Sequence, residues 1–227
     1  MTKLSLAVKT IQKVKSNKIS VSELMEDTIE RINNLNGRVN AIVSLKEKDD
    51  LLNQAKKAEE IDSDNQGPLH GLPIAIKDLL DVKGLPTVQG SPIFANQIAK
   101  KDDIMVSRLR KAGAIIIGKT NTPEFGVGSN TFNSVFGQTY NPYNLDCTCG
   151  GSSGGAAVAV ATGMLAIADG TDMMGSLRNP AAWNNIYGMR PTWGLVPNDP
   201  GTEVFLHNLS TSGPMARSPE DLALLLS

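Results

Sequence analysis

The length and charge of the chain exclude several classes of protein. At 227 residues it can bury a core as one large domain or two small ones, and its 22 Lys and Arg against 23 Asp and Glu give a formal net charge of −1, too little positive charge to hold nucleic acid. Because we find neither a secretion signal nor an apolar stretch of membrane-spanning length, we expect a cytoplasmic protein without nucleic acid or a membrane as partner.

The first part of the chain predicts helices. Apolar residues recur at helical spacing after Ser20, which forms a capping box with Glu23, and Gly37 should end this helix. The charged stretch 46–64 carries one narrow apolar face, which predicts a second helix that faces solvent. We therefore expect residues 1–65 to form a helical N-terminal arm.

Strands and helices alternate from residue 66 onward. Short apolar runs predict buried strands at 74–76, 114–117 and 166–168. Helices are predicted at 105–111, at 153–164 and from near Ser176. This alternation is typical of the α/β class, so residues 66–227 should form an α/β core, a mixed β-sheet sandwiched by helices.

The end of the chain also predicts a helix. Ser218 is a good N-cap and Pro219 suits the first helical position, and Leu222, Leu224, Leu225 and Leu226 follow. A helix of about two turns leaves no room for these leucines to pack against anything that follows it. We expect a C-terminal part to be missing.

One motif favours a nucleotide hydrolase. Residues 113–120 match the phosphate-binding pattern GxxxxGKT. That loop must expose its backbone amides, whereas the Ala-Ile-Ile-Ile interior here predicts a buried strand, and residues 121–123 predict a turn and not a helix start. We therefore interpret the segment as a strand.

Histidine and cysteine chemistry is not favoured either. A Ser-His-Asp triad would need His70 or His207, and both are interpreted as ordinary loop histidines. Cys147 and Cys149 lie one residue apart, where a disulfide would be strained, and no basic neighbour activates a thiol. We predict two free loop cysteines, no metal site and no cofactor.

The most informative stretch is rich in glycine and serine. Residues 150–155 read Gly-Gly-Ser-Ser-Gly-Gly, and residues 170–180 follow after a predicted helix and strand. A flexible linker is one interpretation, but the stretch lies between elements that we expect to be ordered. Consecutive small residues also suit a backbone that turns tightly and approaches a ligand, which we favour.

These residues carry a resemblance to a known family. Residues 150–180, together with 71–78, closely resemble the amidase signature family of Ser-cisSer-Lys amide hydrolases. Further blocks agree in order, namely 118–125, 141–142, 188–192 and 212–217. The spacings from Lys77 to Ser152 (152 − 77 = 75) and from Ser152 to Ser176 (176 − 152 = 24) are those expected of members. The resemblance implies the N-terminal portion of an amidase-signature-like α/β core, from a longer member.

The resemblance also implies a reaction. A small-molecule carboxylic amide would lose its C–N bond through a serine acyl-enzyme, with Ser176 as nucleophile, Lys77 as an uncharged base and Ser152, which follows a cis peptide, as the relay. A buried lysine can stay neutral because burial disfavours the ammonium form, and a hydroxyl can donate and accept together. The implied oxyanion donors are the backbone N–H groups of Met173, Met174, Gly175 and Ser176. Ser153, Asp172 and Arg178 would support them.

Three departures leave the function open. Met174 stands where the family usually has glycine; we expect it to have an ordinary φ, with its side chain only narrowing the pocket. Cys147 and Cys149 replace residues expected before Ser152 and could alter substrate contacts.

The third departure is length, because members of the family continue well past residues 213–217. The chain could thus be an active amidase, as a homo-oligomer or with its missing C-terminal half supplied elsewhere. Alternatively, it is a truncated, catalytically impaired homologue, or the glutaminase (A-type) subunit of an aminoacyl-tRNA amidotransferase.

Overall fold

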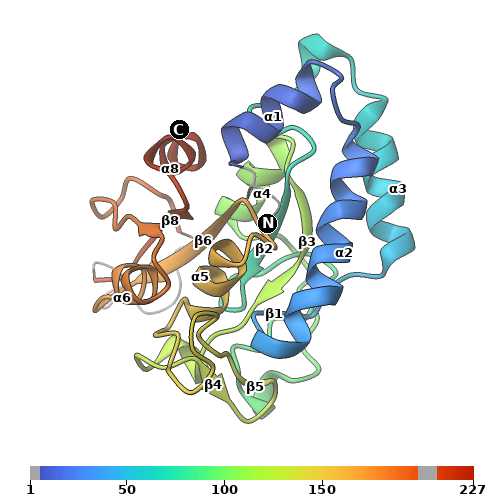
Figure 1. Ribbon diagram of the computed structural model, residues 1–227. Coiled ribbons are helices and arrows are strands. Elements are labelled where there is room, and N and C mark those ends of the chain that lie inside the picture. The colour runs from blue at the N-terminus through green and yellow to red at the C-terminus, as the bar shows by residue number, and fades with distance from the viewer. Residues whose placement is uncertain (1–5, 199–208) are drawn as a thin grey trace.

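The computed structural model describes residues 6–198 and 209–227 (Figure 1). Its helices are α1 (Ala7–Lys15), α2 (Val21–Val39), α3 (Lys48–Glu59), α4 (Ile104–Lys111), α5 (Gly154–Ala161), α6 (Arg178–Trp183) and α8 (Pro219–Leu226). Its strands are β1 (Ile42–Val43), β2 (Pro73–Lys77), β3 (Ile115–Thr120), β4 (Phe132–Asn133), β5 (Gly137–Gln138), β6 (Ile167–Asp172), β7 (Tyr187–Gly188) and β8 (Thr211–Ala216). The predicted alternation of strands and helices is therefore confirmed.

The strands form mixed sheets. In one sheet the order is β1-β3-β2, with β2 parallel and β1 antiparallel to β3, and in another β8 lies between β6 and β7 with antiparallel pairing. β2 and β6 lie side by side, and helices flank the strands on both sides (Figure 1). This arrangement brings the ends of β2 and β6 together with the start of α5.

The predicted capping box at the start of α2 is present. Ser20 Oγ accepts the N–H of Glu23, and the Glu23 carboxylate accepts the N–H of Ser20. The prediction that Gly37 ends this helix is wrong, because the helix continues to Val39. The helix ends instead at Asn40, which takes a left-handed conformation with φ 51° and donates its N–H to Asn36 O, a role that asparagine tolerates well.

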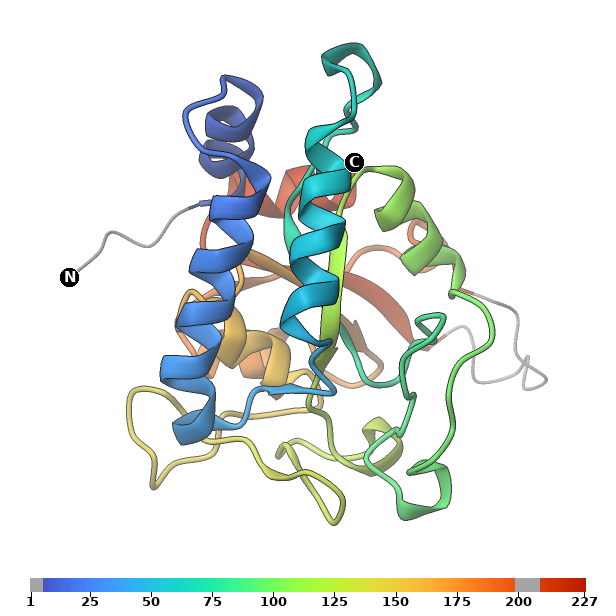
Figure 2. The same ribbon diagram turned by 90° about the vertical axis from the view of Figure 1, so that its right-hand side faces the viewer.

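Residues 6–65 are joined to the rest of the fold. α2 and α3 pack side by side (Figure 2), and apolar residues of both share one core with α5. β1 pairs with β3, with Ile42 opposite Thr120. The boundary at residue 65 stays a prediction.

The last helix packs against the first. Ser218 caps α8 through Asp221 N, and the buried Asp221 carboxylate accepts the N–H groups of Ala7 and Val8 at 3.0 and 2.9 Å. Leu222, Leu224 and Leu225 are partly buried against a second core cluster that includes residues of β2 and β3. The leucines therefore pack on elements that precede α8 in the chain, a contact that the sequence did not predict.

The phosphate-loop motif is a strand. All six residues of β3, Ile115–Thr120, are buried, so the Gly-Lys-Thr of this motif lies inside the sheet. The interpretation of this segment as a strand is confirmed.

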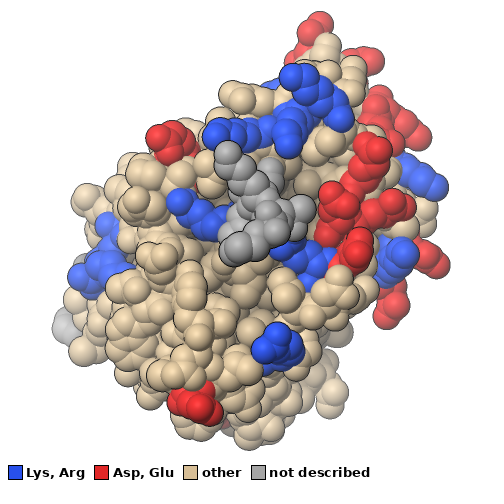
Figure 3. Space-filling model, in the orientation of Figure 1, with Lys and Arg blue, Asp and Glu red and all other residues tan. Residues whose placement is uncertain are grey.

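The surface carries a mixed charge pattern. On the face drawn in Figure 3, acidic side chains gather over α2 and α3, and the lower part carries few charges. Within residues 6–198 and 209–227, none of the helices combines the length and the apolar character that crossing a bilayer requires.

Candidate active site

The side chain of Lys77 is completely buried and contacts three hydroxyl groups. Its Nζ lies 2.8 Å from Ser152 Oγ, 2.9 Å from Ser153 Oγ and 2.8 Å from Thr171 Oγ1. Lys77 is the last residue of β2 and pairs with Thr120 of β3, so the sheet fixes its backbone. The structure thus brings together the predicted residues Lys77, Ser152 and Ser153.

Burial governs the charge of this lysine. Removal from water lowers the pKa of Lys77 to about 7, although the nearby carboxylates of Asp169 and Asp172 favour the charged form and raise it. A substantial neutral fraction is therefore present near pH 7.

Ser152 follows a cis peptide. The Gly151–Ser152 bond is cis, as the resemblance implied. The glycines around it are required by close approach: a Cβ on Gly155 would lie 2.3 Å from Asn121 N, and one on Gly150 would lie 2.4 Å from Asn179 Oδ1. The glycine-rich segment therefore runs close against other chain segments, and its approach to a ligand stays a prediction.

Ser153 links three segments at the start of α5. Its Oγ accepts the N–H of Thr171 at 3.2 Å and donates to the carbonyl of Thr171 at 3.3 Å, and its own N–H donates to Ser176 O at 3.3 Å. Because the Ser153 proton is used by a carbonyl, this hydroxyl can act toward Lys77 only as an acceptor.

The turn after β6 is organised by Asp172. Its buried carboxylate accepts the N–H groups of Gly175 at 2.7 Å and Leu177 at 3.2 Å, together with Arg178 Nε at 3.0 Å and Arg190 Nη1 at 3.1 Å. Burial alone would raise the pKa of Asp172, but these hydrogen bonds and the Arg178 charge outweigh it and lower the pKa to about 2. The carboxylate is therefore ionised and holds the turn.

Ser176 is present in this turn but stands apart from the lysine cluster. It is partly exposed, and its Oγ makes no hydrogen bond with any residue in the described parts of the chain. Its link to the cluster is through the backbone, by way of Ser153 N. The structure therefore brings Lys77 and Ser152 into contact but does not bring the Ser176 hydroxyl within hydrogen-bond distance of either side chain.

The predicted oxyanion donors differ in availability. The N–H of Gly175 is already bonded to Asp172 Oδ1, whereas those of Met173, Met174 and Ser176 have no acceptor within the described residues. Met174 is absent from the described residues with positive φ, and Gly175, with φ 116°, takes the conformation that needs glycine. The expected ordinary φ of Met174 is confirmed, and its side chain is 91% exposed. The effect of this side chain on the width of a substrate pocket stays a prediction.

Sequence reasoning assigned no role to Thr171, Asp169 or Arg190. Thr171 lies inside the stretch 170–180, Asp169 directly precedes it on β6, and Arg190 belongs to the block 188–192. Alternation along a strand could have indicated that Asp169 and Thr171 point the same way. The burial of Asp169 against Lys77 could not be predicted from the chain.

The other candidates lie outside this cluster. His70 is buried in the turn before β2, where its N–H donates to Gly67 O, and His207 lies outside the described residues. Cys147 is exposed and Cys149 is buried, both are free, and burial raises the pKa of Cys149 to about 12. The buried Cys149 thiol therefore lacks the depressed pKa of a reactive cysteine.

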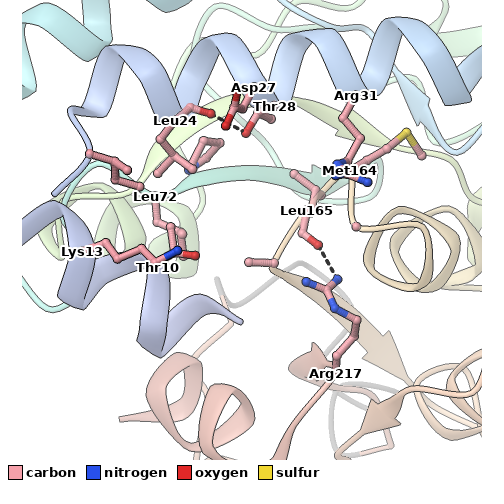
Figure 4. Close-up of a pocket in the computed structure, with 14 residues that line it drawn as sticks. Thr10, Lys13, Leu24, Asp27, Thr28, Arg31, Leu72, Met164, Leu165 and Arg217 are labelled. Atoms are coloured by element: carbon pink, nitrogen blue, oxygen red, sulfur yellow. Dashed lines mark hydrogen bonds between the residues drawn. The ribbon is translucent and has the colours of Figure 1, made fainter. Parts of the chain in front are cut away.

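A separate surface pocket lies away from these residues. It has a volume of about 300 Å³ between α1, α2 and the segment that leads into β6 (Figure 4). Arg31 and Arg217 enter it from opposite sides, and Arg217 donates to Leu165 O at 2.9 Å. None of Lys77, Ser152 and Ser176 lines it.

Comparisons with known proteins agree with this fold and these motifs. The A-type subunit of the glutamyl-tRNA(Gln) amidotransferase of Exiguobacterium sibiricum is 42% identical over 94% of this chain and 44% of the relative. The indoleacetamide hydrolase of Bradyrhizobium diazoefficiens is 42% identical over 97% of this chain and 43% of the relative. The chain therefore spans less than half the length of these curated relatives.

Solved structures show the same fold. A bacterial aryl acylamidase of the amidase signature family superposes with a TM-score of 0.91 at 34% identity, over 98% of this chain and 47% of that one. The peptide amidase of Stenotrophomonas maltophilia gives 0.90 at 33% identity, with the same coverage. The class is thus that of α/β proteins with amidase signature architecture, and the predicted fold class is confirmed.

The family follows from a direct match. The family model described as Amidase matches residues 23–227, so the chain belongs to the amidase family.

Proposed function

We propose that this protein hydrolyses the C–N bond of a small carboxylic amide, with Ser176 as nucleophile, Ser152 as relay and Lys77 as base. The observation that carries the proposal is the contact of 2.8 Å between the buried Nζ of Lys77 and Ser152 Oγ. An amide is a poor electrophile, so the attacking hydroxyl needs a group that takes its proton.

The hydrogen count around Lys77 supports a basic role. A neutral amine has two N–H bonds and one lone pair, and three hydroxyl groups surround it. Ser153 can only accept, and Thr171 can take the second N–H. The lone pair then faces Ser152, whose proton it can receive.

The proposed reaction moves protons along this chain of groups. Lys77 takes the proton of Ser152 while Ser152 takes that of Ser176, whose Oγ attacks the carbonyl carbon. As the C–N bond breaks, the proton returns through Ser152 to the leaving nitrogen, and water then hydrolyses the acyl-serine by the same route. The developing oxyanion would be met by the free N–H groups of Met173, Met174 and Ser176, while Gly175 and Asp172 hold the turn.

The comparisons do not identify which carboxylic amide is the substrate. One relative named as an indoleacetamide hydrolase and one named as part of an amidotransferase are each 42% identical, so identity favours neither. A role as the A-type component of an amidotransferase, with partner subunits, is therefore the second candidate. Release of ammonia from glutamine or from indole-3-acetamide separates the two.

Labelling with a fluorophosphonate, which reacts with activated serines, tests the proposal. We expect the 227-residue chain to be labelled, Ser176→Ala to be unlabelled, and Lys77→Ala to react about 10²–10⁴-fold more slowly, the usual contribution of a general base. The exposed Ser134 provides a control, because Ser134→Ala should behave as wild type. Equal labelling of wild type and Ser176→Ala would remove the assignment.

A further inference from the structure

Asp169 is a buried carboxylate that the proposed reaction does not use. Only 2% of the residue is exposed, and its Oδ1 accepts the backbone N–H of Lys77 at 3.0 Å. Its Oδ2 is buried and has no hydrogen-bond partner in the described parts of the chain. Asp169 lies on β6, directly beside the end of β2, so its charge acts on the lysine at short range.

A buried carboxylate with an unpartnered oxygen is costly unless a cation compensates for it. Two buried lysines are near. Lys119 Nζ already lies 3.3 Å from Asp78 Oδ1 and also donates to Leu80 O at 2.7 Å. Within the described residues Lys77 has hydroxyl partners and no ion pair, so it is the cation that an ionised Asp169 would favour.

The other carboxylates near Lys77 form ion pairs with other side chains. Asp172 of β6 is paired with Arg178 and Arg190, and Asp78, which directly follows β2, is paired with Lys119 of β3. The segment 150–160 at and after Ser152 carries no ionisable side chain apart from its hydroxyls. Among the described residues, Asp169 is thus the carboxylate beside Lys77 whose charge no ion pair balances.

We propose that Asp169 is a positioning residue that holds a proton on Lys77, so that the lysine acts as a base only at a higher pH than burial alone would set. Its two effects are separable: Oδ1 fixes the backbone of Lys77, and the charge favours the ammonium form. Burial raises the pKa of Asp169 to about 6 even though the hydrogen bond from Lys77 N–H and the charges of Lys77 and Lys119 oppose the rise, so most of the carboxylate is ionised near pH 7, where Lys77 titrates. This inference rests on the proposed function, because Lys77 is the base of the proposed reaction.

The test is the pH dependence of fluorophosphonate labelling in the full chain, from about pH 5 to 9. Asp169→Asn keeps an oxygen that can accept the Lys77 N–H but removes the charge. We expect the midpoint of the acidic limb to move down by about one pH unit, with a similar plateau rate. Asp221→Asn is the matched control, because Asp221 is similarly buried and contacts α1: it should lower the melting temperature and leave the midpoint unchanged.

An unchanged midpoint in folded Asp169→Asn would overturn the inference, as would a shift to higher pH. If Asp169→Asn does not fold, Asp169→Ala is measured in its place, with circular dichroism as the check on folding. If wild type is not labelled at any pH, the proposed function fails, and NMR titration of the Lys77 side chain still decides the inference. The Lys77 midpoint should then be lower in the variant than in wild type, and equal midpoints would contradict it.

Discussion

Asp78 and Lys119 form an ion pair with 3.3 Å between Oδ1 and Nζ, and both side chains have no exposed surface. Asp78 directly follows Lys77 at the end of β2, so the two side chains point in different directions: one toward Lys119, the other toward the hydroxyl cluster. The pair also anchors the loop after β2, since Lys119 Nζ donates to Leu80 O and Asp78 Oδ1 accepts Val88 N–H at 3.2 Å.

This pair should be more important for folding than for chemistry. Lys119→Met leaves the Asp78 carboxylate buried and alone, which we expect to cost about 3–5 kcal/mol in the free energy of unfolding. The double variant Lys119→Met/Asp78→Leu should cost clearly less, because no unpaired charge remains. Urea titrations measure both, and a double variant as unstable as the single one would contradict the assignment.

Thr171 should orient the lysine through its hydroxyl. Thr171→Val keeps the shape of the side chain but removes the oxygen that lies 2.8 Å from Lys77 Nζ. We expect the labelling rate to fall about tenfold, the effect of losing one hydrogen bond of ~1.4 kcal/mol. Thr171→Ser keeps the hydroxyl and should stay near wild type, so equal losses in both variants would show that packing, not the hydroxyl, matters.

Features that depend on neighbouring residues could be predicted from the sequence more completely than features that depend on tertiary contacts. The capping box at Ser20, the strand at 74–76 and the helix cap at Ser218 were predictable, because neighbours along the chain determine them. The end of α2 was not, since two acceptable residues, Gly37 and Asn40, compete for the left-handed position.

The same distinction applies to the residues of the candidate site. The motif resemblance identified Lys77 and Ser152, which the structure brings to 2.8 Å although 75 residues separate them. Thr171 and Asp169 were missed because their contacts with Lys77 arise from β6 lying beside β2, a tertiary relationship without a local pattern. The catalytic role of Ser176 stays a prediction, since its hydroxyl has no hydrogen-bond partner among residues 6–198 and 209–227.

The two residues before Ser176 should differ in their tolerance of substitution. Gly175 has φ 116° and open space where a Cβ would lie, so Gly175→Ala strains the backbone without crowding and should lower the free energy of unfolding by about 1–3 kcal/mol. Met174 has no positive φ and an exposed side chain, so Met174→Gly should change the labelling rate less than Gly175→Ala does. Labelling rates and melting temperatures of both variants check this, and the reverse order would mean that Met174 has the constrained backbone.

Lys77 should lower stability while it enables the reaction. Its pKa of about 7 in the folded chain lies below the ordinary value of 10.5, so the folded state binds fewer protons than the unfolded state between these values. Stability from this group therefore rises with pH across that window, and it is smallest below pH 7. The double variant Lys77→Met/Asp169→Asn removes the penalty without leaving the buried Asp169 carboxylate uncompensated, and we expect a gain on the order of 1 kcal/mol or more at neutral pH, together with a flatter dependence on pH and the loss of labelling. Urea unfolding at about pH 6.5 and pH 9 measures the slope. Lys77→Arg is the control because it keeps a charge in the cavity and should be less stable than wild type, whereas a double variant as pH-dependent as wild type would show that the lysine is not the group responsible.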